Sequence, residues 1–312
     1  MSITLNWSNR GQAVTSVKIY RNLHRSETPT LLTTLNTPDE TYTDTTAEMN
    51  KLYFYRVALV IGDEEVPGAV VPMMSVNDTG PGPKALVAGT MEYGYFGTLT
   101  PDEFLTTSDV QRVGTPNGFT SYSSGTIALW RKFANMGRII YIPNAPVWQV
   151  STATTGINAL QLLYSSGYLY GGGGTDRAPG LTGSRAQDKK ATLGAYEFYV
   201  RVPNAEYDRD PTTQYTTGTS FNTYGGEVSM VASANNYGPI QSYISAGAGW
   251  PRIAPPTTLT AIGHGYLLTS TMANNLQVTF FANQQQSVGT SVAGTTANVI
   301  FGFLTILELI LG

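Results

Sequence analysis

In the first 75 residues, apolar and polar side chains alternate in five short runs, and a polar turn segment follows each run. Alternation with a period of two places every second side chain on the same face of a β-strand, as with Ile3, Leu5 and Trp7 in the first run. Short strands at this spacing predict an all-β sandwich. The runs are Ser2–Trp7, Val17–Arg21, Leu31–Leu35, Thr41–Thr46 and Lys51–Val60.

A segment rich in glycine and proline follows, with the sequence VNDTGPGPKALVAGT over residues 76–90. Its NDTGPGP core has the composition of turns and of breaks between regular elements. We therefore predict a sandwich domain at residues 1–75, a partly stiff linker at 76–90 and a larger domain at 91–312.

Charged residues make up only 12% of the 312 residues, about half of the usual share. A charge-poor surface is typical of proteins that bury their faces against neighbours, and it also occurs on secreted β-proteins. The net charge of −3 comes without any long run of one sign, which argues against nucleic acid as a partner.

The composition also narrows the chemistry that the chain can carry out. The chain has no cysteine and only two histidines, which excludes disulfides, thiolate zinc sites and a cysteine nucleophile. The N-terminus lacks the pattern of a signal peptide. The longest apolar run, Val299–Leu311, is too short to cross a bilayer and contains Glu308, so we expect a buried strand and no membrane insertion.

The stretch with the most signals of regular structure runs from Leu129 to Gly171. Two β-type runs, Leu129–Phe133 and Arg138–Ile142, flank an Asn-Met-Gly sequence that is typical of a hairpin turn. Further on, Ile157, Leu160, Leu163 and Tyr164 have helical spacing, and Gly167 suits the end of that helix.

Upstream of this stretch, Thr100, Pro101 and Glu103 have the pattern of a capped helix start, and Ser108 and Asp109 offer a second cap. Downstream, AYEFYVRV at residues 195–202 predicts a strand.

Several aromatic and basic residues are candidates for an interface or a ligand contact. The Trp130 ring has the chemistry to stack on a sugar, and the cationic groups of Arg131, Lys132 and Arg138 have the chemistry to bind an anion. The favoured alternative is that Trp130 and Phe133 are core residues and that the basic side chains point into solvent. Tyrosines in loops suit a subunit interface or a receptor surface equally well. The remaining candidates are Trp148, Tyr237, Tyr243 and Trp250.

No catalytic motif stands out. The four glycines 171–174 lack the Lys-Ser/Thr of a phosphate loop, no serine has a G-x-S-x-G context, and nothing selects a carboxylate pair for glycoside hydrolysis. We therefore predict a protein that is not an enzyme, with no cofactor and no metal site.

The order LNWS, VKIYR, TYTDTT and YFYRVALV over the first 75 residues resembles a fibronectin type III domain. The resemblance implies an immunoglobulin-like sandwich that serves as an adhesive or spacer module. It places Trp7 in the core and makes Tyr53 the corner tyrosine, whose hydroxyl bonds back to the main chain.

A second resemblance spans residues 91–312 and depends on the order of its motifs. These are EYGYFGTLTPDEFLTT, LWRKF with MGRIIYIPNAPVWQVS, a helix ending in Tyr-Gly, YEFYVRV, a GGE segment and FGFLTILEL. In this order they resemble a family of tailed-bacteriophage virion proteins. Arg138 replaces the family's usual lysine, VWQVSTATTG replaces its Ser-Trp-Asp helix start, and the segment after GGE lacks its Trp and Asn-Arg pair. The resemblance therefore concerns the fold more than any binding surface.

This second resemblance implies a mostly β fold with a larger, irregular α+β domain, whose closing strand is similar to that of C-type-lectin-like adhesins. It implies a structural protein of the virion, in a neck, collar or fibre-like appendage, that forms a homo-oligomer (a trimer or a higher ring) with other virion proteins as partners. The alternatives are a host-recognition adhesin that binds cell-surface glycan and a capsid decoration protein.

Overall fold

The computed structural model describes residues 2–25, 27–36, 39–122, 126–143, 147–152, 156–175, 181–202 and 305–312, together with five strands between 264 and 303. The described chain is mostly β, with strands numbered to β20 and two helices. Its contacts divide it into two compact units. Unit 1 comprises residues 1–79 and 90–92, and unit 2 comprises residues 80–89 and 93–312. The segment 76–90, predicted as a linker, is thus shared between the two units.

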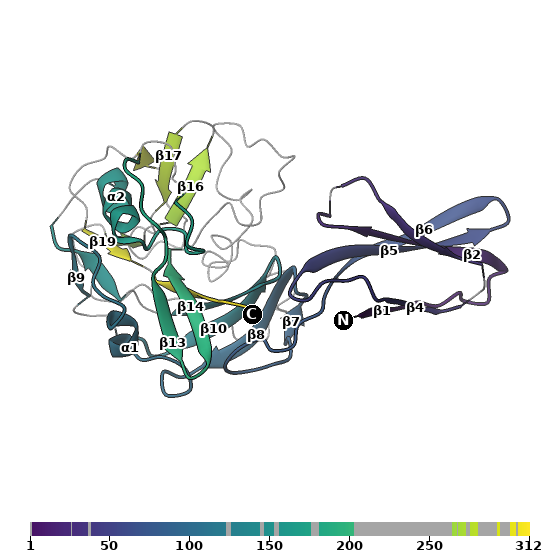
Figure 1. Cartoon of the computed structure of the whole chain (residues 1–312), viewed down its shortest axis with the longest axis horizontal. Helices are drawn as coiled ribbons and strands as arrows, with labels where there is room; N and C mark the ends of the chain where they lie inside the picture. Colours follow the sequence, from purple (N-terminus) through teal and green to yellow (C-terminus); the bar gives the residue numbers. More distant parts are fainter. Residues whose placement is uncertain are drawn as a thin grey trace. The chain divides into compact units, whose positions relative to one another are not determined.

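Unit 1 is a sandwich of two antiparallel sheets (Figure 1). The smaller sheet pairs β1 (Ile3–Asn6) with β4 (Thr41–Asp44). The larger sheet has the order β3-β2-β5-β6, and its strands are β3 (Leu31–Leu35), β2 (Val14–Asn22), β5 (Leu52–Ile61) and β6 (Glu64–Met74). The sequence predicted every one of these strands except β6.

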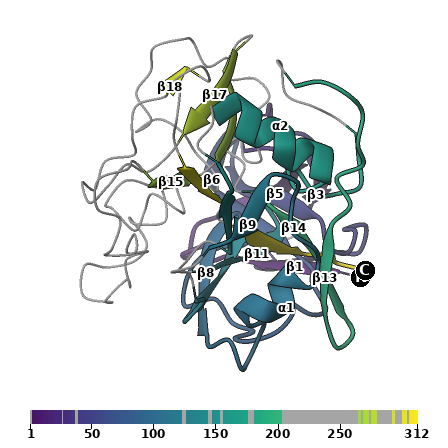
Figure 2. The ribbon, with the colours of Figure 1, turned by 90° about the vertical axis from the view of Figure 1, so that its left-hand side faces the viewer.

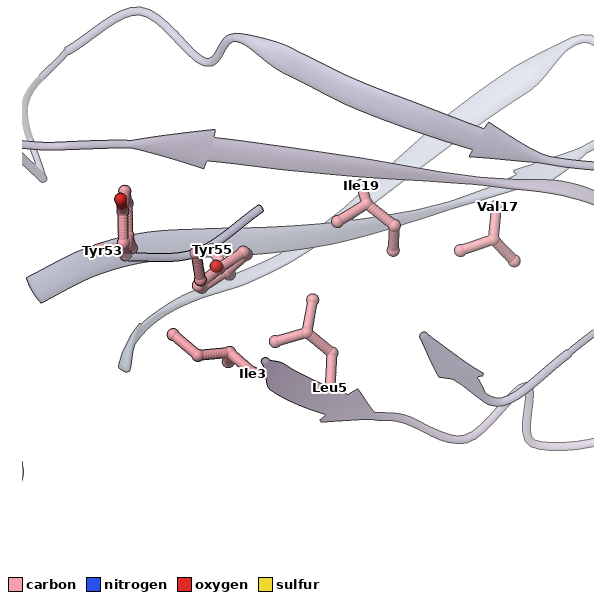
Figure 3. Close-up of a cluster of buried hydrophobic side chains, with 7 residues drawn as sticks. Ile3, Leu5, Val17, Ile19, Tyr53 and Tyr55 are labelled. Carbon is pink, nitrogen blue, oxygen red and sulfur yellow. The ribbon is translucent and has the colours of Figure 1, made fainter. Parts of the chain in front are cut away.

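The core of unit 1 lies between the two sheets, as Figure 3 shows. Ile3 and Leu5 point from β1 toward Val17 and Ile19 of β2 and toward the tyrosines of β5. The shared face predicted for β1 is therefore confirmed for its first two members. Trp7 is only partly buried and packs at the rim of this cluster, so its predicted place in the core is correct only in part.

Unit 2 is built on a seven-stranded antiparallel sheet with the order β13-β14-β20-β11-β10-β8-β7. The hairpin β10–β11 lies near its centre. The strands are β13 (Lys190–Leu193), β14 (Tyr196–Arg201), β20 (Ile306–Leu309), β11 (Arg138–Pro143), β10 (Trp130–Asn135), β8 (Tyr93–Leu99) and β7 (Ala88–Gly89).

Two smaller sheets complete the described part of unit 2. One has the order β15-β19-β12-β9 and the other β16-β17-β18. The single closing strand predicted at Val299–Leu311 is wrong, because β19 and β20 belong to different sheets. The strands are β15 (His264–Tyr266), β19 (Ile300–Phe303), β12 (Trp148–Val150), β9 (Phe119–Ser121), β16 (Leu268–Met272), β17 (Asn275–Thr279) and β18 (Val292–Ala293).

Both helices belong to unit 2. The predicted helix is confirmed as α2 (Gly156–Ser166), which lies beside β17 (Figure 2) and ends at Gly167 with φ 86°. The short helix α1 (Thr107–Gln111) begins with a capping box between Thr106 and Asp109. The capped helix start predicted at Thr100 is wrong: Glu103 accepts the N–H of Thr100 at 2.8 Å, which is half of a capping box, and the two residues close a turn and not an α-helix. No helix among the described residues is long and apolar enough to cross a membrane.

Candidate functional site

The β10–β11 hairpin is the element on which the sequence placed most of its candidate contacts. Its strands pair from Trp130↔Pro143 to Asn135↔Arg138. The turn residues Met136 and Gly137 both have positive φ, at 48° and 79°, as a two-residue primed turn requires. The predicted hairpin is therefore confirmed, with its turn at the predicted residues.

The two tryptophans of this stretch are core residues. The side chain of Trp130 is fully buried, packs edge-on against Phe104 and donates its indole N–H to the carbonyl oxygen of Leu105 at 2.7 Å. Trp148 is equally buried and meets Tyr168 with ring centroids 5.6 Å apart. Neither indole offers an open face to a sugar, so the core interpretation of Trp130 is confirmed.

The expectation that the basic neighbours of Trp130 point into solvent is wrong. Arg131 is 1% exposed and Lys132 is fully buried, while Arg138 is partly buried. The cause is the place of β10 in the sheet: all six of its residues are buried, so alternation sends no side chain into solvent. Burial lowers the pKa of Arg131.

Lys132 holds three backbone carbonyl groups of the glycine- and proline-rich segment. Its Nζ donates to the oxygens of Gly80, Pro81 and Pro83 at 3.2, 3.0 and 2.7 Å. The Tyr141 hydroxyl also donates to the oxygen of Pro81 at 3.0 Å. The segment 80–83 is therefore fixed to the sheet of unit 2 by charge-assisted hydrogen bonds.

Glycine is required where this segment meets the sheet. Gly80 and Gly82 have φ of 80° and 77°, which side chains rarely adopt. A Cβ atom on Gly82 would come within 2.3 Å of a methyl carbon of Leu99, and one on Gly80 within 2.8 Å of Leu309. The turn composition that predicted a boundary thus also permits close contact with the sheet.

A buried ion pair joins two neighbouring strands of the same sheet. Arg201 on β14 is fully buried and donates to Oε2 of Glu308 on β20 through Nε at 2.7 Å, with Nη2 at 2.6 Å. Its Nη1 donates to the carbonyl oxygen of Val202 at 3.0 Å. The two residues are diagonal neighbours, because Arg201 pairs with Ile306 and Tyr199 with Glu308.

Asp44 is a buried carboxylate in the core of unit 1. It is fully buried, and its Oδ2 accepts from Arg21 and from the Tyr55 hydroxyl, each at 2.7 Å. Its Oδ1 accepts from the Thr46 hydroxyl at 2.7 Å and from the Thr46 N–H at 2.9 Å. Burial alone would raise the pKa of Asp44, but these hydrogen bonds outweigh it and hold the pKa below its ordinary value.

Asp44→Asn should destabilise unit 1 by about 2 kcal/mol at neutral pH, because the amide cannot accept all four hydrogen bonds. A depressed pKa means that Asp44 stabilises the fold above its unfolded-state pKa of about 3.9 and that this contribution is lost as the pH falls through the lower folded-state pKa. Urea unfolding of the full chain between pH 7 and pH 2 should therefore show a shallower acid dependence in the variant. Asp63→Asn, in the exposed β5–β6 turn, is the control, and equal acid profiles for both variants would contradict the assignment.

The structure also contains a site that the sequence did not indicate. A groove of about 660 Å³ in unit 1 is lined by β1 with the residues that follow it and by the apolar side chains of β5 and β6. The groove exists because a strand edge in unit 1 has no neighbouring strand among the described residues. A local sequence pattern does not show which edges of a sheet are left open.

The remaining candidate residues from the sequence add no site to the described part of the structure. Tyr237, Tyr243 and Trp250 lie outside the described residues. Within the described residues, no group of three or more histidine or acidic side chains is placed to hold a metal ion. No protein-family model and no curated protein matches this chain.

Proposed function

We propose that this chain is a non-enzymatic structural component of a tailed-phage virion that acts through contacts with other virion proteins. The proposal follows the order of motifs over residues 91–312. It is supported by one observation above all: the aromatic and basic residues of the W-R-K-F motif are buried and hold the sheet together. Residues used in this way serve a scaffold, and the charge-poor composition suits a surface that neighbours cover.

For unit 1 we propose a fibronectin type III-like module. Two features support it. The strands are divided two against four, and Tyr53, at the start of β5, has its hydroxyl bonded back to the N–H of Glu48 at 3.3 Å. A tyrosine corner of this kind marks immunoglobulin-like sandwiches. The sandwich has six described strands, one fewer than the seven of a constant-type immunoglobulin domain.

A homo-oligomer, as a trimer or a higher ring, is part of the proposal. Sedimentation velocity of the purified full chain should show one species of at least three times the monomer mass of 33.5 kDa, unchanged on dilution. A stable monomer at micromolar concentration would contradict the obligate oligomer.

The location of the protein within the virus particle distinguishes the structural proposal from its alternatives. We expect gold-labelled antibodies against the chain to mark the neck, collar or a fibre-like appendage in electron micrographs of intact particles. Labelling over the whole head would instead identify a capsid decoration protein. Labelling at appendage tips, together with binding of the purified chain to host cells, would identify a glycan-binding adhesin.

A further inference from the structure

The groove of unit 1 lies where the smaller sheet stops short of the larger one. Two strands, β1 and β4, face four strands in the other layer. Residues of β1, β5 and β6 line the groove, whereas no residue of β4 does. The opening therefore borders one edge of the smaller sheet, the outer edge of β1.

The backbone of β1 is ready to accept another strand at this edge. Trp7 donates its N–H to the carbonyl oxygen of Glu40, just before β4, at 3.0 Å. Since hydrogen-bonding directions alternate along a strand, Ile3 and Leu5 bond toward β4, and the N–H and C=O groups of Thr4 and Asn6 point to the outer edge. No described strand pairs with β1 on that side.

The opposite border of the groove is protected against strand pairing. β6 contains Pro67 and Pro72, and its pairing with β5 is irregular near Gly68. Prolines and bulges of this kind prevent edge-to-edge association. β1 carries neither proline nor charge, so only one of the two borders is open to a strand. The floor is apolar, and its residues Val66 and Val71 are 43% and 49% exposed.

Two polar groups at the groove point to the chemistry of its occupant. The indole Nε1 of Trp7 is buried and finds no acceptor among the described residues. Arg10 is exposed, and its guanidinium forms no ion pair within the described part of the chain, while no acidic residue lines the groove. A ligand that supplies a main-chain carbonyl near Trp7 and a carboxylate near Arg10 would satisfy both groups.

We propose that this groove binds an extended peptide segment of another protein, which adds to the smaller sheet as a strand beside β1. Its alternate apolar side chains cover Val66 and Val71, and an acidic residue faces Arg10. Strand addition of this type takes its affinity from main-chain hydrogen bonds and its specificity from side-chain pockets.

A second copy that pairs through its own β1 does not fit this opening. The core of each sandwich places β2 and β5 beneath β1, so the larger sheet of the second copy would have to occupy the space of β6. A segment without a second layer meets no such obstacle. The occupant is therefore a single extended strand.

The test uses the full-length protein and a fluorescein-labelled nine-residue peptide in which valine and threonine alternate and one end is glutamate. Fluorescence anisotropy should show saturable binding of this peptide.

Asn6→Pro removes an N–H that faces the open edge and should weaken binding at least tenfold. Thr43→Pro is the matched control, because Thr43 pairs with Thr4 and its N–H faces the other edge of the same sheet; it should leave binding within twofold. Absence of binding to the wild type, or equal losses in the two variants, would overturn the proposal.

A second pair of variants tests the floor in case the proline changes disturb folding. Val71→Asp places a charge in the groove and should weaken binding at least tenfold. Val87→Asp, at a position in unit 2 that is 72% exposed, should have no effect. Equal effects of these two substitutions would argue against the groove.

Charge reversal tests the acidic end of the occupant. The wild type should prefer the glutamate peptide to one that ends in lysine, and Arg10→Glu should reverse this preference. Hydrogen exchange with bound peptide should slow at residues 2–10 and not at 41–44. An unchanged preference in Arg10→Glu, or protection at 41–44 instead, would place the peptide elsewhere.

Discussion

Lys132→Met should lower the free energy of unfolding of unit 2 by about 3 to 4 kcal/mol. The methionine side chain fills a similar volume but donates no hydrogen bond, so three charge-assisted bonds to Gly80, Pro81 and Pro83 are lost,. The carbonyl of Pro81 keeps the Tyr141 hydroxyl. Calorimetry of the full chain should show a fall of roughly 10 °C in the Tm of one transition. Hydrogen exchange should become faster over residues 80–89.

Lys84→Met is the matched control for this result. Lys84 also donates to the carbonyl oxygen of Gly80, at 2.6 Å, but its residue is exposed, so solvent competes for this bond. Its loss should cost less than about 1 kcal/mol. Equal Tm values for the two methionine variants would show that, in solution, Lys132 does not fix the segment 80–83 to the sheet.

Glu308→Gln should destabilise unit 2 by about 3 kcal/mol, because it leaves the fully buried guanidinium of Arg201 without its anionic partner,. The neutral amide keeps the shape of the carboxylate, so the change isolates the charge. Thermal unfolding of the full chain, followed by tryptophan fluorescence, is a suitable measurement. We expect the transition that reports on Trp130 to shift to lower temperature.

The comparison for Glu308 is Glu197→Gln in the neighbouring strand. Glu197 pairs with Lys190 at 3.1 Å, and both side chains are more than a third exposed. Solvent screens such a pair, so its loss should change stability by no more than about 0.5 kcal/mol. A loss for Glu197→Gln as large as that for Glu308→Gln would show that burial does not set the strength of these pairs.

The elements that the sequence predicted correctly are those with a strong local period. Tyr53 and Tyr55 alternate with Phe54 in β5, and both tyrosines are in the core. Leu160, Leu163 and Tyr164 follow the helical period, and all three are buried in α2. In each case neighbouring residues carry the whole signal.

Other elements depend on contacts between distant residues, and the sequence missed them. Pro67 and Pro72 argue against a strand at β6, which is an edge strand and tolerates them,. The burial of Arg131 and Lys132 follows from the central place of β10 in its sheet, which no local pattern reveals. The groove beside β1 was missed for the same reason.

The place of β20 has a consequence for when unit 2 can fold. β20 is the last of the described strands in chain order, yet it lies between β14 and β11 inside the sheet. Until synthesis has passed Leu309, the pair β13–β14 has no neighbour that joins it to β11, and 107 residues separate Arg201 from its partner Glu308. Closing so long a loop is slow. Unit 1 has no such dependence and is free to fold while the ribosome is still translating unit 2.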